Sequence, residues 1–333
     1  MFLIESYTLA VVFCIITMLC WGSWANTQKL AGPAWRFELF YWDYVIGVLL
    51  LAVIFAFTLG SRGDEGRPFL ADVQQAESTY ILSALLGGVI FNMANILLVA
   101  AIAIAGMAVA FPVGIGIALV LGVLINYLAA PVGNALLLFG GVVLVTVAIL
   151  LNAAAYRKLT AQIQKVPTKG MVLSVVCGIL MSLFYRFVAG SMATDFANPE
   201  PGLLTPYTAV FFFSVGVSGS NFIFNWILMK RPIEGPPLSA SDYFRGSPRS
   251  HLMGWLGGII WCIGMAFNII ASGPAGFAIS YGLGQGATLV AALWGVFIWK
   301  EFREAPLGTR PLLGWMFICY LVGLSLLVLS RFY

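Results

Sequence analysis

The second half of this sequence repeats the first. Shifting the chain against itself by 170 positions aligns Gly87–Val120 with Gly257–Val290 without a gap, and 11 of these 34 pairs are identical. In most other pairs the two residues are chemically similar, as with Phe91 and Trp261. Both copies lie in strongly apolar sequence, and a duplicated apolar unit is the usual construction of secondary transporter folds. The repeat therefore restricts the fold to two related halves.

Composition places both halves in a membrane. Hydrophobic residues make up 61% of the 333 residues and charged residues 9%, whereas soluble domains carry roughly 45–50% and 25%. No soluble core could hide so much apolar surface, so the lipid bilayer is the predicted solvent. The net charge of +4 is spread over short loops, which argues against a nucleic-acid partner. The five cysteines lie in apolar runs without metal-ligand spacing, and we expect them to be packing residues.

Ten apolar runs are long enough to cross the bilayer, which takes about 20 residues of helix. Their approximate limits are 8–30, 40–60, 80–104, 106–128, 131–152, 170–190, 205–229, 252–272, 275–299 and 311–331. The first run follows Glu5, has no preceding Lys or Arg, and is too long for the core of a signal peptide, so we expect a retained helix. The very short links Ala105-Gly106 and Gly273-Pro274 predict two tight helical hairpins.

The repeat also extends, more weakly, to the first span. At an offset of 163, Val12, Cys14, Ile16 and Met18 fall on Val175, Cys177, Ile179 and Met181. Each half then holds five helices, within 1–155 and 170–333, and a cytoplasmic loop at 156–169 connects them. Because five is odd, the second half enters the membrane inverted relative to the first. The predicted fold is all-α, with ten transmembrane helices in two inverted five-helix repeats.

The basic residues predict how the protein is oriented. The odd-numbered loops carry 13 of the 17 Lys and Arg residues, whereas the even-numbered loops and the chain end carry Arg62, Arg67 and Arg331. Because cytoplasmic loops are enriched in Lys and Arg, this bias places both termini outside the cytoplasm. We expect a multi-pass protein of the plasma (inner) membrane.

Polar residues at helical spacing inside the spans predict a binding cavity, since unpaired polar groups are costly in lipid. Aromatic rings beside amides suit a neutral ligand rich in hydroxyl or amide groups. The candidate substrate-binding residues are Trp21, Trp24, Asn92, Asn95, Arg186, Asn221, Asn225, Trp261, Asn268, Tyr281, Gln285 and Thr288. Each single amide has a structural alternative, because Asn and Gln also join transmembrane helices. Trp24 has the alternative of an interface anchor.

Two charged residues inside the spans carry separate predictions. Arg186 lies in the outer half of the sixth span and is a candidate donor to substrate oxygens, with snorkelling or structural pairing as the alternative. Asp43, in Tyr41-Trp42-Asp43-Tyr44, is the candidate proton-coupling carboxylate, with an exposed interfacial Asp as the alternative. Glu38 is expected to be interfacial.

Glycine and proline mark candidate gating hinges in the fourth and ninth spans. The repeat aligns Phe111–Gly116 with Tyr281–Gly286, and both segments hold residues that weaken a helix. The candidate hinges are Pro112, Gly114, Gly116, Gly284 and Gly286, with close helix packing as the alternative.

Several motifs of catalysis do not occur in this sequence. There is no GxxxxGK[ST] motif, so ATP-driven transport by this chain alone is not expected. The single histidine, His251, is expected in a loop, and no HExxH or cysteine cluster predicts a metal site. We predict that the protein is not an enzyme and uses no cofactor.

Three short motifs resemble a known family. They are Cys20–Asn26 at the end of the first span, Tyr41–Tyr44 at the start of the second, and Gly87-Gly88 in the third. With the duplicated ten-span pattern they resemble the drug/metabolite transporter superfamily, and within it the ureide permease branch with its relatives, the glucose/ribose uptake proteins and the rhamnose transporter. The resemblance covers nearly the whole chain. It implies peripheral fifth and tenth helices, with a cavity lined by the others.

The same resemblance implies a substrate class. It points to uptake of a small neutral solute, namely a ureide such as allantoin, a nucleobase-like compound or a monosaccharide, with protons or another coupling ion. We therefore predict a secondary active importer that works by alternating access, as a monomer or homodimer. An exporter of metabolites or amphipathic drugs from the same superfamily is the alternative. An intramembrane enzyme or lipid scramblase is disfavoured, because the chain lacks a catalytic constellation.

Overall fold

The computed structural model describes residues 1–159, 167–233 and 235–333, and it confirms the all-α class. Ten helical segments are long and apolar enough to span a membrane, as predicted. In chain order they are α1 and α2 (Tyr7–Ser23, Asn26–Ala31), α3 (Phe37–Phe57), α5 (Ser78–Ala105), α6 (Met107–Ala129), α7 (Ala135–Leu159), α8 (Thr168–Ala189), α9 (Pro206–Lys230), α11 (Pro248–Ala275), α12 with α13 and the π-helix η1 (Phe277–Gly284, Ala287–Leu293, Trp294–Ile298) and α14 (Thr309–Leu329). Two short helices, α4 (Phe69–Gln75) and α10 (Ala240–Phe244), lie in loops.

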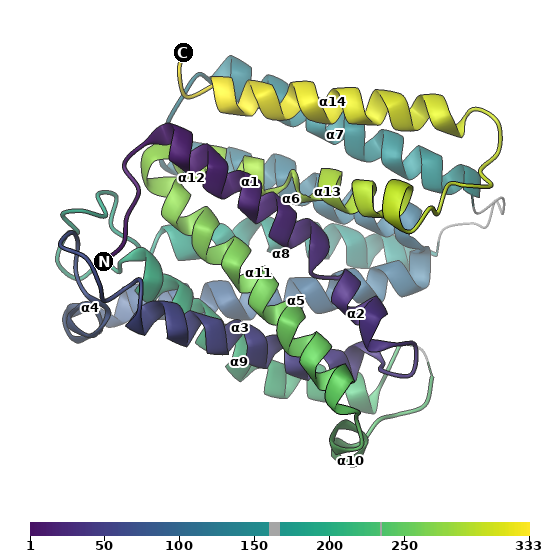
Figure 1. Cartoon of the computed structure of the whole chain (residues 1–333), viewed down its shortest axis with the longest axis horizontal. Coiled ribbons are helices and arrows are strands. Elements are labelled where there is room, and N and C mark those ends of the chain that lie inside the picture. Colours follow the sequence, from purple (N-terminus) through teal and green to yellow (C-terminus); the bar gives the residue numbers. More distant parts are fainter. Residues whose placement is uncertain (160–166, 234) are drawn as a thin grey trace.

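The two ends of the chain lie on one face of the helical bundle (Figure 1). The Tyr7 hydroxyl donates to the carbonyl of Val328 at 2.7 Å, which joins the first span to the last. We call this the terminal face, and it also carries α4. The opposite face carries α10 and is called the α10 face.

Single glycines form the two tight hairpin turns. Gly106 separates α5 from α6 with φ of 78°, and Gly276 separates α11 from α12 with φ of 84°. Such angles are accessible to glycine without steric cost. The second link was therefore predicted wrongly, because α11 continues through Gly273 and Pro274 and turns at Gly276. Pro274 has no N–H group, so it removes one helical hydrogen bond next to this turn.

Glycines let helices of the two halves approach closely, and they do so in matched pairs. A Cβ added to Gly88 would lie 2.0 Å from the Phe213 carbonyl oxygen, and one added to Gly258 would lie 1.9 Å from that of Tyr44. Gly88 and Gly258 are related by the 170-residue repeat. Contacts of α5 with α9 are thus mirrored by contacts of α11 with α3, whereas the inverted orientation of the two halves stays a prediction.

The fifth and tenth spans pack together along one edge of the bundle, as α7 and α14 (Figure 1). Gly141 and Gly323 each lie against the other's carbonyl oxygen. This edge position agrees with the peripheral helices that the family resemblance implied. Helix α7 extends to Leu159 and α8 begins at Thr168, so both ends of the predicted 156–169 connection are helical. Residues 160–166 of that connection lie outside the described residues.

The candidate hinges behave differently in the two halves. Helix α6 runs without interruption through Pro112, Gly114 and Gly116. The ninth span is interrupted at Gln285-Gly286, between Gly284 and Ala287, and the amides of residues 286, 288 and 289 bond three residues back. The first span is also interrupted, at Trp24-Ala25 between α1 and α2.

Candidate functional site

Six aromatic rings meet where α1, α3, α5, α8, α9 and α11 come together. Trp261 of α11 lies at their centre, with ring centroids 4.4 Å from Phe91, 5.8 Å from Trp21 and 5.8 Å from Phe213. Tyr44 and Phe184 complete the set, which we call the aromatic centre. The stacked and tilted rings offer the apolar faces that a planar ligand needs.

The aromatic centre follows the internal repeat. Phe91 and Trp261 are repeat counterparts and contact each other, as expected of residues beside a two-fold axis. At the offset of 163, Phe184 corresponds to Trp21, and each ring packs on the other half's member of the central pair. Only Trp21 and Trp261 were predicted. Phe91 could have been found from the repeat alignment, which pairs it with Trp261.

Four asparagines line the contact of α5 with α9. The Asn92 amide donates to the Ser220 hydroxyl at 2.9 Å, and that of Asn95 donates to the Tyr41 hydroxyl at 3.1 Å. The Asn225 amide donates to the Glu38 carbonyl at 2.9 Å and thereby joins α9 to α3. Asn221 is fully buried beside them. Asn92, Asn95 and Asn225 thus join helices, which is the structural alternative given for these amides.

Several buried polar atoms of this region have no hydrogen-bond partner among the described residues. Asn221 has none for either amide atom, and Asn92, Asn225 and Asn268 have none for the side-chain oxygen. The Tyr44 hydroxyl shares this property. Buried polar groups are nearly always paired, and one left unpaired costs about 1–3 kcal/mol. These unpaired donors and acceptors are candidate partners for a polar ligand or for buried water.

A second polar group joins α11, α12 and α6. The Asn268 amide donates to the Ser280 carbonyl at 2.8 Å, and the Tyr281 hydroxyl lies 3.1 Å from the Ala118 carbonyl of α6. Gln285 and Thr288 flank the interruption of the ninth span and are buried, with the Thr288 hydroxyl bonded to the Gln285 carbonyl. A Cβ on Gly284 would lie 2.9 Å from both Asn268 and Trp21, so this group adjoins the aromatic centre.

Trp24 and Arg186 lie at the margins. The Trp24 ring sits at the α1–α2 interruption, half-buried and 4.8 Å from the Tyr44 ring. Arg186 is half-buried in the last turn of α8, where a Cβ on Gly190 would lie 2.9 Å from its guanidinium. A cation is favourable at a helix C-terminus, which gives Arg186 a local electrostatic role. Its contact with substrate stays a prediction.

Asp43 forms a cluster that the sequence did not reveal. It is fully buried in the second turn of α3 rather than exposed at an interface. It accepts hydrogen bonds from the Tyr243 hydroxyl at 2.6 Å and lies 2.9 Å from Nδ1 of His251. His251 is not in a loop as predicted but in the first turn of α11, because α11 begins at Pro248. The ring of Trp35 packs edge-on against His251.

The Asp43 cluster couples three segments at the α10 face. Burial and the adjacent carboxylate raise the pKa of Tyr243 well above its ordinary value, so its hydroxyl stays a donor to Asp43. Asp43 lies on α3, Tyr243 on α10 and His251 on α11. A change in the charge of Asp43 or His251 therefore acts directly on the packing of α10 against α3 and α11.

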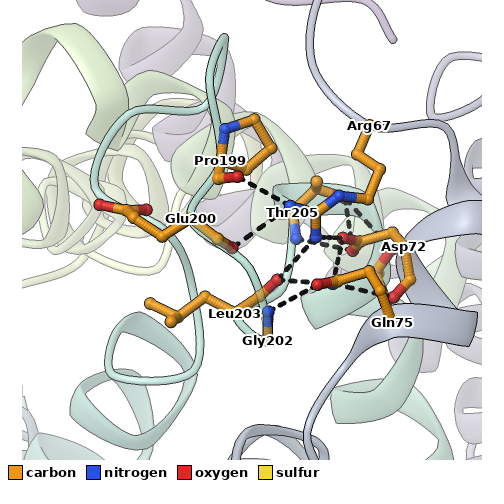
Figure 2. Close-up of polar contacts among 9 residues, drawn as sticks. Arg67, Asp72, Gln75, Pro199, Glu200, Gly202, Leu203 and Thr205 are labelled. Atoms are coloured by element: carbon orange, nitrogen blue, oxygen red, sulfur yellow. Dashed lines mark hydrogen bonds and ion pairs between the residues drawn. The ribbon is translucent and has the colours of Figure 1, made fainter.

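The loops of the terminal face are held together by a second buried carboxylate, as Figure 2 shows. Asp72 of α4 is fully buried, pairs with Arg67 at 2.8 Å and accepts hydrogen bonds from the backbone and hydroxyl of Thr205. Arg67 also donates to the Pro199 carbonyl at 2.7 Å. Gln75 accepts a hydrogen bond from the amide of Gly202. We call this set the Asp72 latch, and it joins the α3–α5 loop to the start of α9.

The two helical hairpins are packed unequally. Near the terminal face, a Cβ on Gly276 would lie 3.0 Å from Val132, and Tyr281 packs on Gly122 of α6. At the α10 face, a Cβ on the counterpart Gly106 would meet no described atom within 4 Å. Gly116 is buried, yet a Cβ added to it would also meet no described atom within 4 Å. A Cβ on its counterpart Gly286 would contact Met18 and Leu324. Among the described residues, the turn at Gly276 is thus packed by its neighbours, whereas the turn at Gly106 is not.

Comparison with known proteins gives one consistent result. Residues 40–169 and 160–330 match the family model described as ureide permease. Ureide permease 1 and Ureide permease 2 of Arabidopsis thaliana are 24% and 23% identical to this chain, over 99% of it and 99% of their own lengths. Probable ureide permease A3 of Vigna unguiculata is 22% identical over 91% of this chain and 98% of its own length.

Solved structures add evidence on the fold. One crystal structure matches with a TM-score of 0.58 at 15% sequence identity, over 98% of this chain and 99% of the other. At this identity the match shows a shared fold and nothing further. The named relatives are permeases rather than enzymes. Among the described residues, no group of three or more His, Cys, Asp or Glu side chains could hold a metal ion.

Proposed function

Because this chain belongs to the ureide permease family and is a membrane transporter, we propose that it imports a ureide. A ureide carries N–H donors and C=O acceptors on a compact, nearly neutral frame. Binding such a compound requires amide and hydroxyl partners in a site that excludes water. The unpartnered atoms of Asn221, Asn92 and Asn268 around the aromatic centre support this substrate class. This array is the observation on which the proposal rests.

The unequal packing of the two hairpins supports an alternating-access mechanism. In alternating access, one repeat rocks against the other around a central site. The hairpin turn at Gly276 is packed, whereas its counterpart at Gly106 is free. The opposite state exchanges these roles, so that the α5–α6 turn closes while the α11–α12 turn opens. The interruption at Gln285-Gly286 is a suitable place for the second hairpin to bend.

Asp43 is the proposed coupling residue. It lies inside a span, is fully buried and contacts the imidazole of His251. Buried carboxylates and histidines within transmembrane segments are typical of proton relays. Glu38, the other buried carboxylate of α3, is held by Arg36 at 2.6 Å and is a poorer candidate for proton exchange. In proton-driven uptake, Asp43 or His251 would take up a proton from one side of the membrane and release it to the other.

The experiment is thermal unfolding of the purified protein with a panel of ureides, nucleobases and monosaccharides. A ligand at about 100 times its dissociation constant stabilises the folded state by about 2.7 kcal/mol. We expect ureides to raise the unfolding temperature and monosaccharides to leave it unchanged. Proteoliposomes then measure the direction of flux under an imposed proton gradient. Stabilisation by monosaccharides alone would exclude the proposed substrate, and efflux alone would favour the exporter alternative.

A further inference from the structure

An apolar groove runs along the outside of the bundle between α3 and α9 and ends beneath α10. Its volume is about 670 Å³. Ile46 and Leu50 of α3 and Phe222 of α9 line it, and their side chains are 41%, 41% and 69% exposed. The groove is separate from the aromatic centre, because these side chains face away from the bundle. We propose that this groove binds one anionic glycerophospholipid.

The length of the groove matches one leaflet. Its α3 wall extends from Trp42 to Val53, which is about 17 Å of helix at roughly 1.5 Å per residue. The hydrocarbon core of a bilayer is about 30 Å thick, so each leaflet supplies roughly half of that. An acyl chain from one leaflet therefore fills the groove from end to end. A water-soluble ligand would gain nothing from walls that are almost wholly hydrocarbon.

Short helix α10 covers the end of the groove and fixes its depth. Tyr243 and Phe244 both line the groove, and Phe244 is 81% exposed. An exposed phenylalanine on a short helix at the membrane boundary is well placed to rest among acyl chains. The hydroxyl of Tyr243 is anchored to Asp43, so the groove wall is continuous with the Asp43 cluster.

Cations stand at the mouth of the groove where a lipid headgroup would lie. Nζ of Lys230 lies 4.9 Å from the centroid of the Trp226 ring, and Trp226 lines the groove. Arg245 directly follows Phe244, is 79% exposed, and reaches Asp242 only at 4.0 Å. The carboxylate of Asp242 is bonded to the hydroxyl and backbone of Ser239, which hold its pKa below the ordinary range. Asp242 therefore stays charged and offsets one of the two cations, which leaves a net positive charge that favours a phosphate over a neutral headgroup.

The choice of an anionic lipid follows from these charges. Each Lys or Arg near the surface of an anionic membrane contributes about 1 kcal/mol to attraction, so two cations offset by one carboxylate correspond to a preference of roughly 5-fold. The predicted orientation also places the α10 face in the cytoplasm, and the cytoplasmic leaflet is the one enriched in anionic lipids. A zwitterionic lipid would fill the same groove without this preference.

Native mass spectrometry of delipidated protein tests the proposal. Phosphatidylglycerol and phosphatidylcholine with identical oleoyl chains are the two probes. We expect the first phosphatidylglycerol to bind about 5-fold more tightly than the first phosphatidylcholine. The double variant Lys230→Gln/Arg245→Gln should lose this difference. The matched control Arg303→Gln/Arg310→Gln, which removes two exposed cations of the α10 face, should keep it.

A groove-filling variant separates the groove from the rest of the surface. Leu50→Trp adds volume on an exposed groove wall without entering the core and should weaken binding of both lipids. Equal affinity of the wild type for the two lipids would overturn the proposal, and so would binding that survives both Leu50→Trp and the double variant. A wild-type dimer that Leu50→Trp dissociates would instead assign the groove to a second copy of the chain. Thermal unfolding with a ureide checks that each variant is folded.

Discussion

At the scale of single residues, Asn221 gives the sharpest test of the binding site. Both of its amide atoms are unpartnered among the described residues, so in the absence of ligand it should destabilise the fold. We expect Asn221→Leu to raise the unfolding temperature while weakening ureide binding by about 2- to 12-fold, the value of one hydrogen bond. Thermal unfolding with and without ligand measures both effects.

Asn95 is the matched control, because its amide is already bonded to Tyr41. Asn95→Leu leaves the buried Tyr41 hydroxyl without this hydrogen bond, so it should lower the unfolding temperature in the absence of ligand. If Asn221→Leu were also destabilising and left ureide affinity intact, Asn221 would be a helix-joining residue.

Asp43 carries a prediction about energy coupling. Asp43→Asn keeps the shape and can still bond to Tyr243 and His251, but it cannot exchange a proton at physiological pH. We expect exchange of labelled for unlabelled ureide to continue, while accumulation driven by a proton gradient is lost. Both are measured in the same proteoliposomes. Accumulation that persists in Asp43→Asn would move the coupling role to another residue.

The residues of the site were only partly predictable. Helical spacing identifies the polar face of each span, so Trp21, Asn92 and Trp261 could be found before the structure. The cluster of Asp43 with His251 could not, because it joins residues 208 apart in sequence and depends on how α3 meets α11. The unpartnered state of Asn221 is likewise a property of packing, which no single helix reveals.

At the scale of elements, the contacts of glycines between helices predict that a Gly→Ala substitution has different effects on stability at two positions. A Cβ on Gly258 would lie 1.9 Å from the Tyr44 carbonyl, so Gly258→Ala must push α11 away from α3. We expect a loss of about 1–3 kcal/mol, the usual cost of overpacking. Gly219 is exposed on α9 with no described atom near its Cβ, and Gly219→Ala should be neutral or stabilising. Thermal unfolding compares the two, and equal effects would contradict the packing.

The existence of the elements was easier to predict than their interruptions. A run of about 20 apolar residues can hardly be anything other than a spanning helix, and all ten runs were identified. The hinge motifs in α6 and in the ninth span are equally rich in helix-weakening residues, yet only the second is interrupted. Gly286 packs against Met18 and Leu324 while Gly116 has room, so tertiary contacts decide which motif bends.

At the scale of the whole molecule, the orientation in the membrane is open to a direct measurement. The bias of basic residues predicts that the terminal face, with loop 190–205, lies outside the cytoplasm. A cysteine placed at exposed Asn198, in a background where the native cysteines are replaced, should react with an impermeant maleimide in intact cells. A cysteine at exposed Arg303, on the α10 face, should react only after permeabilisation. The reverse pattern would invert the topology.

In the proposed alternating-access cycle, the Asp72 latch would set how often the terminal face opens. Opening would separate Asp72 from Thr205 and Arg67 from the Pro199 carbonyl, so closed molecules would dominate the population at rest. A substrate that arrives from that side meets only the open fraction, and its apparent dissociation constant rises in inverse proportion to this fraction. An open fraction of about 1% would raise that constant about 100-fold relative to the intrinsic value. In that cycle, the strength of one loop contact would thereby set the concentration range in which the transporter responds.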